Sequence, residues 1–454
     1  MRLQIVIILL SSAMLSCSED DSQAENDIDN SVDFQNQVEI IRTFGGSEED
    51  DALSVTETAD GQIAILGFTQ SNDGDVVGKL ATDSDYWLLK LDKELNLIWQ
   101  KTFGGSSDDR GQSVIPTNDG GFLITGYARS SDGDIAQNFG FHDFWILKLD
   151  ASGEIMWEKS FGFQGNDRAY SAIQTADDGF FISGFLDVSA SNGEGNDDGT
   201  SGRPKNFTQK HGVGEFWGIK LNQNGDTEWR RYFGGSNNDR SYDAVQTDDG
   251  SILMIGSSES NDFDILDPKG SYDFWAVNVS LNGDMIWQKN YGGSGIDIGY
   301  SVETSSDNAY YVAGDTRSSD GDIMDFKGNT DYFVIKIDQN GNLIWQKTFG
   351  GTDFDSARTI LELQSGELFI AGSSRSNDLQ LAENLGQNDI WIVHAQASGS
   401  LIAANNIGGS EIDLANDAIQ LQTGEVVVVG SSESNDNNIS QNKGDKDLLV
   451  IKLK

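Results

Sequence analysis

The chain has 454 residues, and its 73 acidic residues outnumber its 30 basic ones, which gives a formal net charge of −43. Such a surface repels the phosphates of nucleic acids and anionic lipid headgroups, so DNA and RNA are excluded as partners. The single cysteine, Cys17, leaves no pair for a disulfide and no set of thiolates for zinc.

Residues 1–16 are predicted to be an export signal. Arg2 is the basic start, and the apolar stretch over 3–15 is too short for a membrane-spanning helix, which needs about 20 residues. The sequence Met-Leu-Ser-Cys that ends at Cys17 resembles a bacterial lipoprotein cleavage box, in which the cysteine becomes the lipidated N-terminus. The alternative is an ordinary secretory signal followed by a chance cysteine.

Residues 17–37 are predicted to be a disordered acidic tether, because they contain too few apolar side chains to bury a core. The run Ser-Glu-Asp-Asp directly after Cys17 resembles the surface-export signal of Bacteroidetes lipoproteins. This resemblance implies a lipid-anchored outer-membrane protein that faces the outside of the cell. The membrane would then be contacted only through the N-terminal lipid.

Seven repeats fill the chain from residue 38 to residue 454, and six of them open with an aromatic residue followed by Gly. The seven anchor residues are Phe44, Phe103, Phe161, Phe233, Tyr291, Phe349 and Ile407. Five of the six intervals are 58 or 59 residues, and the third is 72. A period of this length is typical of propeller or solenoid architectures.

The second repeat predicts four strands. Its runs at 111–117, 121–128, 144–149 and 155–161 are rich in β-branched and aromatic residues, and Gly-containing turns separate the first pair and the last pair. No segment longer than a turn has helical periodicity. The sequence therefore predicts an all-β fold, a seven-bladed β-propeller with four-stranded antiparallel blades.

Tryptophans recur in two slots of the repeat, which indicates packing between blades. The third-strand slot holds Trp87, Trp145, Trp217, Trp275 and Trp391, and the fourth-strand slot holds Trp99, Trp157, Trp229, Trp287 and Trp345.

The two ends of the repeat region predict how the ring closes. The last repeat stops at a third-strand segment, 447–454, whereas 38–44 matches the fourth-strand pattern. The N-terminal strand is therefore expected to join the last blade, which also removes an exposed sheet edge.

The motif Trp-Gln-Lys-Thr-Phe-Gly-Gly-Ser at 99–106, followed by Thr-Asn-Asp-Gly-Gly at 117–121, resembles the bacterial β-propeller repeat proteins common in Bacteroidetes. The resemblance covers 38–454 and implies the fold, but propellers host many unrelated activities. Repeat three departs from the motif at 162–164, and repeat six lacks the fourth-strand Trp at 401–406, so local irregularity is expected in both.

An aspartate lies six residues after every anchor, and we interpret it as a cap for the loop between blades. The seven are Asp50, Asp109, Asp167, Asp239, Asp297, Asp355 and Asp413. Seven-fold repetition favours structure, because a catalytic role would need one unique copy. Aspartate also accepts backbone N–H bonds readily in tight turns.

Loops of the form Ser-x-Asp-Gly-Asp, followed by an acidic residue before the third strand, suggest calcium. The candidate ligands are Asp73, Asp75 and Asp85, then Asp132, Asp134 and Asp143, then Asp320, Asp322 and Asp331. Carboxylates supply the hard oxygen ligands that Ca²⁺ prefers. Turns capped by Asp explain the pattern equally well.

The long third interval contains the one strongly unrepeated segment, 187–211. It carries Arg203, Lys205 and His211, while Arg110, Arg168 and Arg240 share one inter-blade position of three consecutive repeats. Together these six residues are predicted to form a patch that binds an acidic glycan or protein, since long loops on a rigid scaffold often carry function. A tolerated, disordered insertion is the alternative.

Enzyme signatures are poor. The three histidines, His142, His211 and His394, occupy different repeat contexts, and no phosphate loop, zinc motif or nucleophile elbow is present. The leading hypothesis is a cell-surface, non-catalytic module that binds or scaffolds a glycan or protein. One alternative is a polysaccharide lyase or hydrolase working in the central funnel, and another is a subunit of an outer-membrane uptake or secretion complex.

Overall fold

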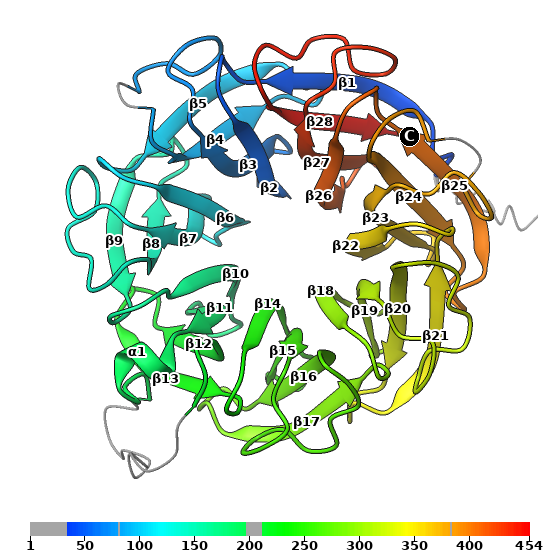
Figure 1. Cartoon of the computed structure of the whole chain (residues 1–454). Helices are drawn as coiled ribbons and strands as arrows, with labels where there is room; N and C mark the ends of the chain where they lie inside the picture. The colour runs from blue at the N-terminus through cyan, green and yellow to red at the C-terminus, as the bar shows by residue number, and fades with distance from the viewer. Residues whose placement is uncertain (1–33, 80–81, 197–210, 382–383) are drawn as a thin grey trace, which may run out of the picture. The chain divides into compact units, whose positions relative to one another are not determined.

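The structure, a computed structural model, describes residues 34–79, 82–196, 211–381 and 384–454. They form seven four-stranded antiparallel sheets arranged as blades around a central channel, which confirms the predicted propeller (Figure 1). Within the described ranges the only helix is α1 (Val188–Ser191), a single turn, and none is long and apolar enough to cross a membrane.

Within each blade the strands are given in order from the channel outward. Blade 1 is β2 (Asp50–Glu57), β3 (Ile63–Thr69), β4 (Asp85–Leu91) and β5 (Leu97–Phe103); blade 2 is β6 (Asp109–Pro116), β7 (Phe122–Ala128), β8 (Asp143–Leu149) and β9 (Ile155–Phe161). Blade 3 is β10 (Arg168–Gln174), β11 (Phe180–Leu186), β12 (Glu215–Leu221) and β13 (Thr227–Phe233); blade 4 is β14 (Asp239–Gln246), β15 (Ile252–Ser258), β16 (Asp273–Val279) and β17 (Met285–Tyr291). Blade 5 is β18 (Asp297–Thr304), β19 (Tyr310–Thr316), β20 (Asp331–Ile337) and β21 (Leu343–Phe349); blade 6 is β22 (Asp355–Glu362), β23 (Leu368–Ser374), β24 (Asp389–Ala395) and β25 (Leu401–Ile407). Blade 7 is β26 (Asp413–Gln420), β27 (Val426–Ser432), β28 (Asp447–Leu453) and β1 (Val38–Phe44).

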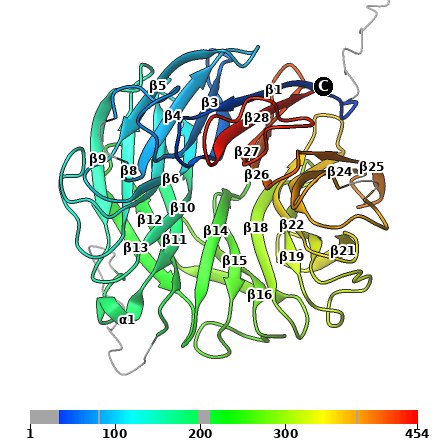
Figure 2. The same cartoon turned by 45° about the horizontal axis from the view of Figure 1, so that its top comes forward.

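The first and last strands of the chain close the ring. β1 pairs antiparallel with β28, from Val38 opposite Leu453 to Phe44 opposite Leu448. The two strands lie side by side in both views (Figures 1 and 2). The closure expected from the repeat pattern is therefore confirmed.

The second and third strands of every blade are buried on both faces, which explains their nearly continuous apolar sequence. All five third-strand tryptophans are 0% exposed. The Tyr86 ring lies 4.7 Å from the Trp145 ring of the next blade, and its hydroxyl donates to the Trp145 carbonyl at 2.9 Å. Among the fourth-strand tryptophans only Trp229 is buried, and the other four are half-buried. The tryptophans therefore join blades, most tightly through the third strand.

The two repeats that depart from the motif still form complete blades. β25 pairs with β24 from Leu401 to Ile407 in the register used by the other outer strands. Blade 3 differs mainly in the loop that carries α1, where Asp187 caps the helix by accepting from the Ala190 N–H. The expected irregularity is thus confined to a loop and to missing side chains.

A β-bulge interrupts every innermost strand. In blade 3 the register steps from Ala169 to Ser171 and leaves Tyr170 unpaired, and the same step occurs at the equivalent place in all seven blades. Each bulge faces a Gly in the second strand; a Cβ on Gly67 would lie 1.8 Å from the Asp51 carbonyl oxygen. Because bulges re-aim side chains, the extra residue of each blade points differently from its neighbours.

Candidate functional site

In the loops before blades 1, 2, 4 and 5, four successive N–H groups are held by carboxylates and a hydroxyl, and in the loops before blades 6 and 7 an amide oxygen replaces one of the carboxylates. In the loop before blade 1, the Gly46 N–H donates to Asp50 at 2.8 Å and the Glu48 N–H donates to Ser71 at 3.0 Å. The Ser47 N–H donates to Asp73 at 2.8 Å, and the Gly45 N–H donates to Asp75 at 3.1 Å. The Ser-x-Asp-Gly-Asp loop is thereby explained as a clamp on the inter-blade turn.

The aspartate six residues after each anchor is buried in all seven blades and accepts the N–H group four residues before it. In blade 4, Asp239 also accepts from the hydroxyls of Ser258 and Ser260, at 2.5 and 2.8 Å. This geometry supports the interpretation of these residues as loop caps.

A second carboxylate faces each cap from the preceding blade, and we call each such couple a junction pair. The seven junction pairs are Asp447 with Asp50, Asp85 with Asp109, Asp143 with Asp167, Glu215 with Asp239, Asp273 with Asp297, Asp331 with Asp355 and Asp389 with Asp413. A Cβ on Gly45 would lie 2.5 Å from Asp447 Oδ1 and 2.6 Å from Asp50 Oδ2, so both oxygens line one small space.

One oxygen of most junction pairs has no hydrogen-bond partner. Oδ1 is buried and unpartnered in Asp85, Asp143, Asp273, Asp331, Asp389 and Asp447. Burial raises the pKa of Asp85 and Asp331 to about 7, and the facing aspartate adds to the rise. A proton on the unpartnered oxygen satisfies it, because the protonated acid can donate to the facing carboxylate.

The structure does not bring the proposed calcium ligands of one loop to one place. Asp73 and Asp75 hold the turn before blade 1, whereas Asp85 faces Asp109 and Asp134 at the next junction. The other two sets divide in the same way, with Asp132, Asp134, Asp320 and Asp322 on turns and Asp143 and Asp331 in junction pairs. Among the described residues no three His, Cys, Asp or Glu side chains are arranged to hold a metal. Calcium stays a prediction.

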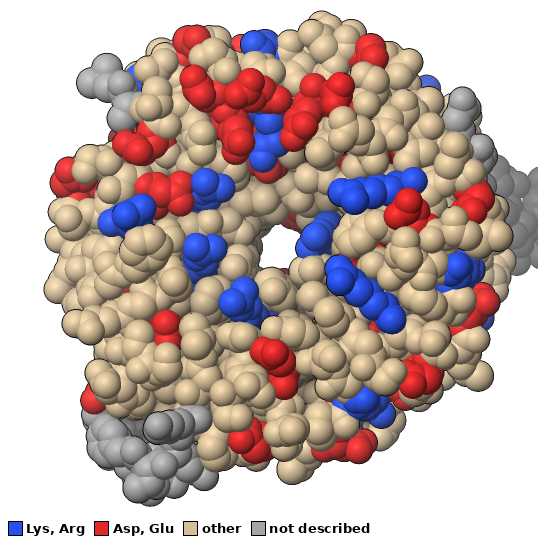
Figure 3. Space-filling model, in the orientation of Figure 1, with Lys and Arg blue, Asp and Glu red and all other residues tan. Residues whose placement is uncertain are grey.

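Arginines gather around the mouth of the channel. We define the loop face as the side that carries the inter-blade loops and the loops from second to third strands. Figure 3 shows basic residues around the central opening on this face. The innermost strands begin there with Arg110, Arg168 and Arg240, and Arg129, Arg317 and Arg375 directly follow second strands. We call these six the mouth arginines.

Five of the mouth arginines form no ion pair with any described residue; the sixth, Arg110, donates to Asp108 at 2.9 Å. Four of these five lie instead against aromatic rings: the guanidinium carbon of Arg168 is 4.5 Å from the Tyr127 centroid, for example, and that of Arg240 is 4.7 Å from the Phe185 centroid. By contrast, lysines such as Lys148 and Lys336 are spent in ion pairs of 2.8 and 2.7 Å. Stacking fixes an Arg side chain and leaves the edge of its fork free for an anion.

The seven bulge residues form a ring inside the channel. They are Leu53, Gln112, Tyr170, Tyr242, Tyr300, Arg358 and Asn416, and they line a cavity of about 130 Å³. The Tyr242 ring centroid lies 5.3 Å from that of Tyr170 and 5.1 Å from that of Tyr300, and Arg358 lies 3.9 Å from the Tyr300 ring. No two neighbouring blades repeat the same chemistry except over the three tyrosines.

Two carboxylates beside this ring tie neighbouring blades together. Asp243 accepts from the Val302 N–H and Asp417 from the Val55 N–H, both at 2.9 Å. Burial raises the pKa of Asp243 to about 6 and that of Asp417 to about 7. Through these hydrogen bonds both residues connect the innermost strands of neighbouring blades.

The predicted basic patch is only partly assembled. Arg110, Arg168 and Arg240 lie together at the mouth, whereas Arg203 and Lys205 lie outside the described residues, as does Cys17 with the signal and most of the tether. His211 Nδ1 lies 3.3 Å from Glu215 Oε2, and its ring packs on Tyr232 and Phe263 rather than on the arginines. Burial lowers the pKa of His211.

The sequence interpretation missed Arg129, Arg317, Arg375 and the channel ring. A column-by-column comparison of the repeats carries the signal. Seven residues after the anchors stand Asp51, Arg110, Arg168, Arg240, Ile298, Ser356 and Leu414, and nine residues after them stand the bulge residues. Positions that vary within a regular repeat mark the surface that packing does not dictate.

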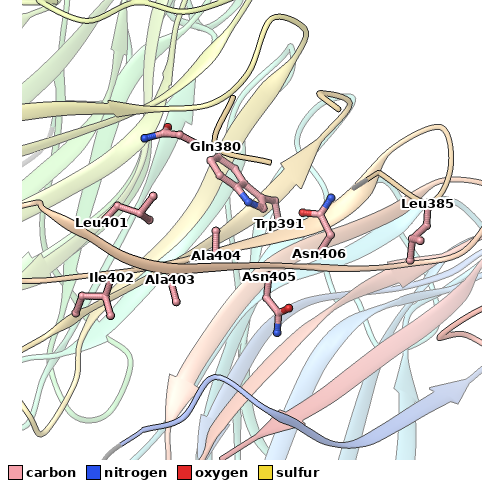
Figure 4. A pocket seen from close by; sticks show the side chains of 9 residues that line it. All are labelled: Gln380, Leu385, Trp391, Leu401, Ile402, Ala403, Ala404, Asn405 and Asn406. Atoms are coloured by element: carbon pink, nitrogen blue, oxygen red, sulfur yellow. The ribbon is translucent and has the colours of Figure 1, made fainter. Parts of the chain in front are cut away.

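A separate groove lies on the outer strand of blade 6. It has a volume of about 500 Å³, and Figure 4 shows its side chains along β25. It exists because Ala403 and Ala404 occupy the places that Trp345 and Gln346 fill in blade 5. Its lining contains no charged residue, so it offers no acid–base pair.

No family model matches the chain. The regulatory protein FlaEY of Caulobacter vibrioides is 24% identical over 208 residues, which is 41% of this chain and 21% of that protein. The chain thus spans about a fifth of the length of this curated relative.

Similar solved structures share 8–13% identity with the chain. BamB from Moraxella catarrhalis has 13% identity and a TM-score of 0.38, with 91% of this chain and 85% of that chain covered. The PQQ domain of pyranose dehydrogenase from Coprinopsis cinerea has 11% identity and a TM-score of 0.39, with 92% and 97% covered. Sqt1 from Chaetomium thermophilum has 11% identity and a TM-score of 0.42, with 86% and 83% covered. Likeness at this level carries no argument about ligand or activity.

Proposed function

We propose that the protein is a non-catalytic binding module that captures a carboxylate- or sulfate-bearing ligand at the channel mouth. One observation carries the proposal: in a protein whose formal net charge is −43, five arginines at the loop-face ends of first and second strands form no ion pair with any described residue, and basic residues surround the central opening (Figure 3). Unpaired cations are hard to explain where carboxylates are so abundant, unless their anion comes from outside.

The geometry of the mouth supports this function. Stacked arginines present their N–H edges in a fixed orientation, and such forks bind carboxylates through two parallel hydrogen bonds. The rival hypothesis of a lyase or hydrolase in the channel lacks a comparable observation, because Asp243 and Asp417 are engaged with backbone N–H groups.

Binding by fluorescence anisotropy, with labelled poly-glutamate and labelled polygalacturonate as probes and neutral dextran as the blank, tests the proposal. Replacing Arg168 and Arg240 with Gln is expected to weaken binding on the order of 100-fold, because two charge-assisted contacts are lost. Added salt is expected to weaken wild-type binding. The matched control replaces Lys289 and Lys347, exposed on β17 and β21, with Gln. Equal affinity in the mouth variant and the wild type rejects the proposed site.

We also propose that Cys17 carries a lipid and that the domain, from residue 38 onward, is displayed on the outer membrane beyond the tether. The support is the cleavage-box sequence and the acidic run that follows it. Replacing Cys17 with Ala is expected to abolish labelling by a radioactive fatty acid and to release the protein from the membrane fraction. Labelling that persists in this variant contradicts the anchor.

A further inference from the structure

Exposed large apolar side chains occur in two places among the described residues. Some are the first residues of outer strands, such as Ile98 and Ile344. The others lie on loops between second and third strands, and we call them the apolar collar: Val77, Phe139, Phe141, Val213, Phe263, Leu266, Met324 and Leu379. The collar therefore shares the loop face with the mouth arginines.

The collar is densest on the loops of blades 2 to 4. The ring of Phe141, 46% exposed, has the Arg129 guanidinium carbon 4.5 Å from its centroid and the His142 ring at the same distance. Val213 and Leu266 are 52% and 66% exposed. Apolar and cationic groups thus lie next to each other in this sector.

Phe263, on the loop face, has a strained backbone conformation. Its φ of 54° is left-handed, at a position where three other blades have Gly74, Gly133 and Gly321. A bulky residue there is strained. The side chain nevertheless stays 37% exposed and stacks on the His211 ring at 4.7 Å. Strain of this kind gathers at ligand-binding surfaces.

The composition of this sector fits a protein better than a glycan. Exposed Val and Leu side chains offer no hydrogen bonds to sugar hydroxyls, and all five third-strand tryptophans are buried in packing. Contiguous apolar surface beside Arg and aromatic residues is typical of protein interfaces.

We propose that the loop face of blades 2 to 4 docks a protein whose contact segment has acidic residues at its centre and apolar residues on both sides. The acidic centre pairs with Arg129, Arg168 and Arg240, which form no ion pair with any described residue, and the apolar flanks cover the collar. This partner class rests on the proposed function, since it uses the same arginines.

Two labelled peptides of equal length and charge test the partner class. Both have a central run of four glutamates, flanked by leucines in one peptide and by serines in the other. The leucine-flanked peptide is expected to bind on the order of tenfold more tightly, through apolar burial. In Phe141→Ser/Leu266→Ser this advantage is expected to disappear while binding of the serine-flanked peptide remains. The single variant Leu266→Ser replaces the double one if the latter does not melt cooperatively.

The control variant Ile98→Ser/Ile344→Ser removes exposed apolar groups from outer strands, 49% and 53% exposed, and is expected to keep the advantage. Equal binding of the two peptides, both lost in Arg168→Gln/Arg240→Gln, overturns the partner class and leaves the proposed function standing. Binding of polygalacturonate but of neither peptide overturns it in favour of a glycan. If neither the peptides nor polygalacturonate binds, the proposed function falls and takes this inference with it.

Discussion

The blade junctions and the channel mouth lie one residue apart on each innermost strand, yet the repeat treats them in opposite ways. Asp239 and its six equivalents are identical, buried and engaged with the neighbouring turn. Arg240, the next residue, has Asp51, Ile298, Ser356 and Leu414 among its equivalents. Successive side chains of a strand point to opposite sides, so one enters the junction and the other reaches the mouth.

This difference separates scaffold from function within a single repeat. Every junction presents a tight turn and a facing carboxylate, which is Asp in six and Glu215 in the seventh, and the capping aspartate is the same in all seven. The mouth is bounded by solvent, so packing places no equal demand on its side chains. The positions that vary are therefore the ones free to follow a ligand.

The largest expected effect is on the junction that closes the ring. Deleting Val38–Phe44 leaves β28 without its outer partner and removes contacts made by Phe44 in the core of blades 7 and 1. The loss is expected to exceed about 5 kcal/mol, comparable to the whole stability of many domains. Urea denaturation measures it. A shortened protein that unfolds at the same urea concentration as the complete one contradicts closure by β1.

The junction pairs predict that stability falls as the pH rises from about 5 to 8. Burial raises the pKa of Asp447 to about 6 and that of Asp167 to about 8, so in this window the folded protein still holds protons that the unfolded chain, with an ordinary Asp pKa of 3.8, has already released. The summed effect is on the order of 5 kcal/mol, since one pKa unit corresponds to about 1.4 kcal/mol. Below about pH 4 stability falls again; although burial opposes it, the Lys148 ammonium lowers the pKa of Asp119 to about 2.

Urea denaturation at pH 5, 6.5 and 8 checks this direction, and a stability that rises from pH 5 to 8 contradicts it. His142 and His211 oppose the trend, because burial lowers the pKa of both, but they are two groups against many. Thermal melting at pH 8, first in EDTA and then in millimolar Ca²⁺, tests the calcium prediction. No shift in melting temperature removes the calcium prediction.

Emptying one inter-blade packing site is expected to cost slightly less. Trp145→Ala removes a side chain that is 0% exposed and contacts Tyr86 of the preceding blade, for a loss of roughly 3–5 kcal/mol. Trp145→Phe is the control, since Phe333 fills this slot in blade 5. Thermal melting decides, and an unchanged melting temperature for the Ala variant rejects the packing role.

The smallest effects on folding are expected from substitutions at the neighbouring residues Asp239 and Arg240. Asp239→Ala leaves the Gly235 N–H and two serine hydroxyls without their acceptor and is expected to cost roughly 2–3 kcal/mol without changing ligand capture. Arg240→Gln is expected to cost less than about 1 kcal/mol, the value of its stacking on Phe185, while it weakens capture. Denaturation and anisotropy on both variants test the division, and a reversed pattern refutes it.

Much of the scaffold was predictable because it is encoded seven times. The anchors set the number of blades, the tryptophan slots marked the buried strands, and the unmatched ends of the chain indicated closure. The caps were predictable because an aspartate beside a Gly-rich turn has few other uses. The site was only partly predictable: Arg110, Arg168 and Arg240 stood out by sharing a position, whereas Arg129 and Arg317 did not.

The arrangement of the acidic loops was decided by the tertiary structure. Asp75 and Asp85 are ten residues apart in the chain, yet they contact different junctions between blades. Asp75 accepts from the Gly45 N–H at the junction before blade 1, whereas Asp85 faces Asp109 at the junction between blades 1 and 2. Spacing along a loop does not reveal this division.

Local patterns of turn, Gly and apolar residues thus determine how many blades form and which strands are buried, because each repeat satisfies the same local rules of packing and hydrogen bonding. Only the closed ring decides what meets at its axis. There the seven bulges direct unlike side chains into one channel, and arginines from separate repeats lie around one opening. The sequence of a single repeat does not reveal this arrangement, because the bulge is a shift in strand pairing and the axis is shared by all seven blades.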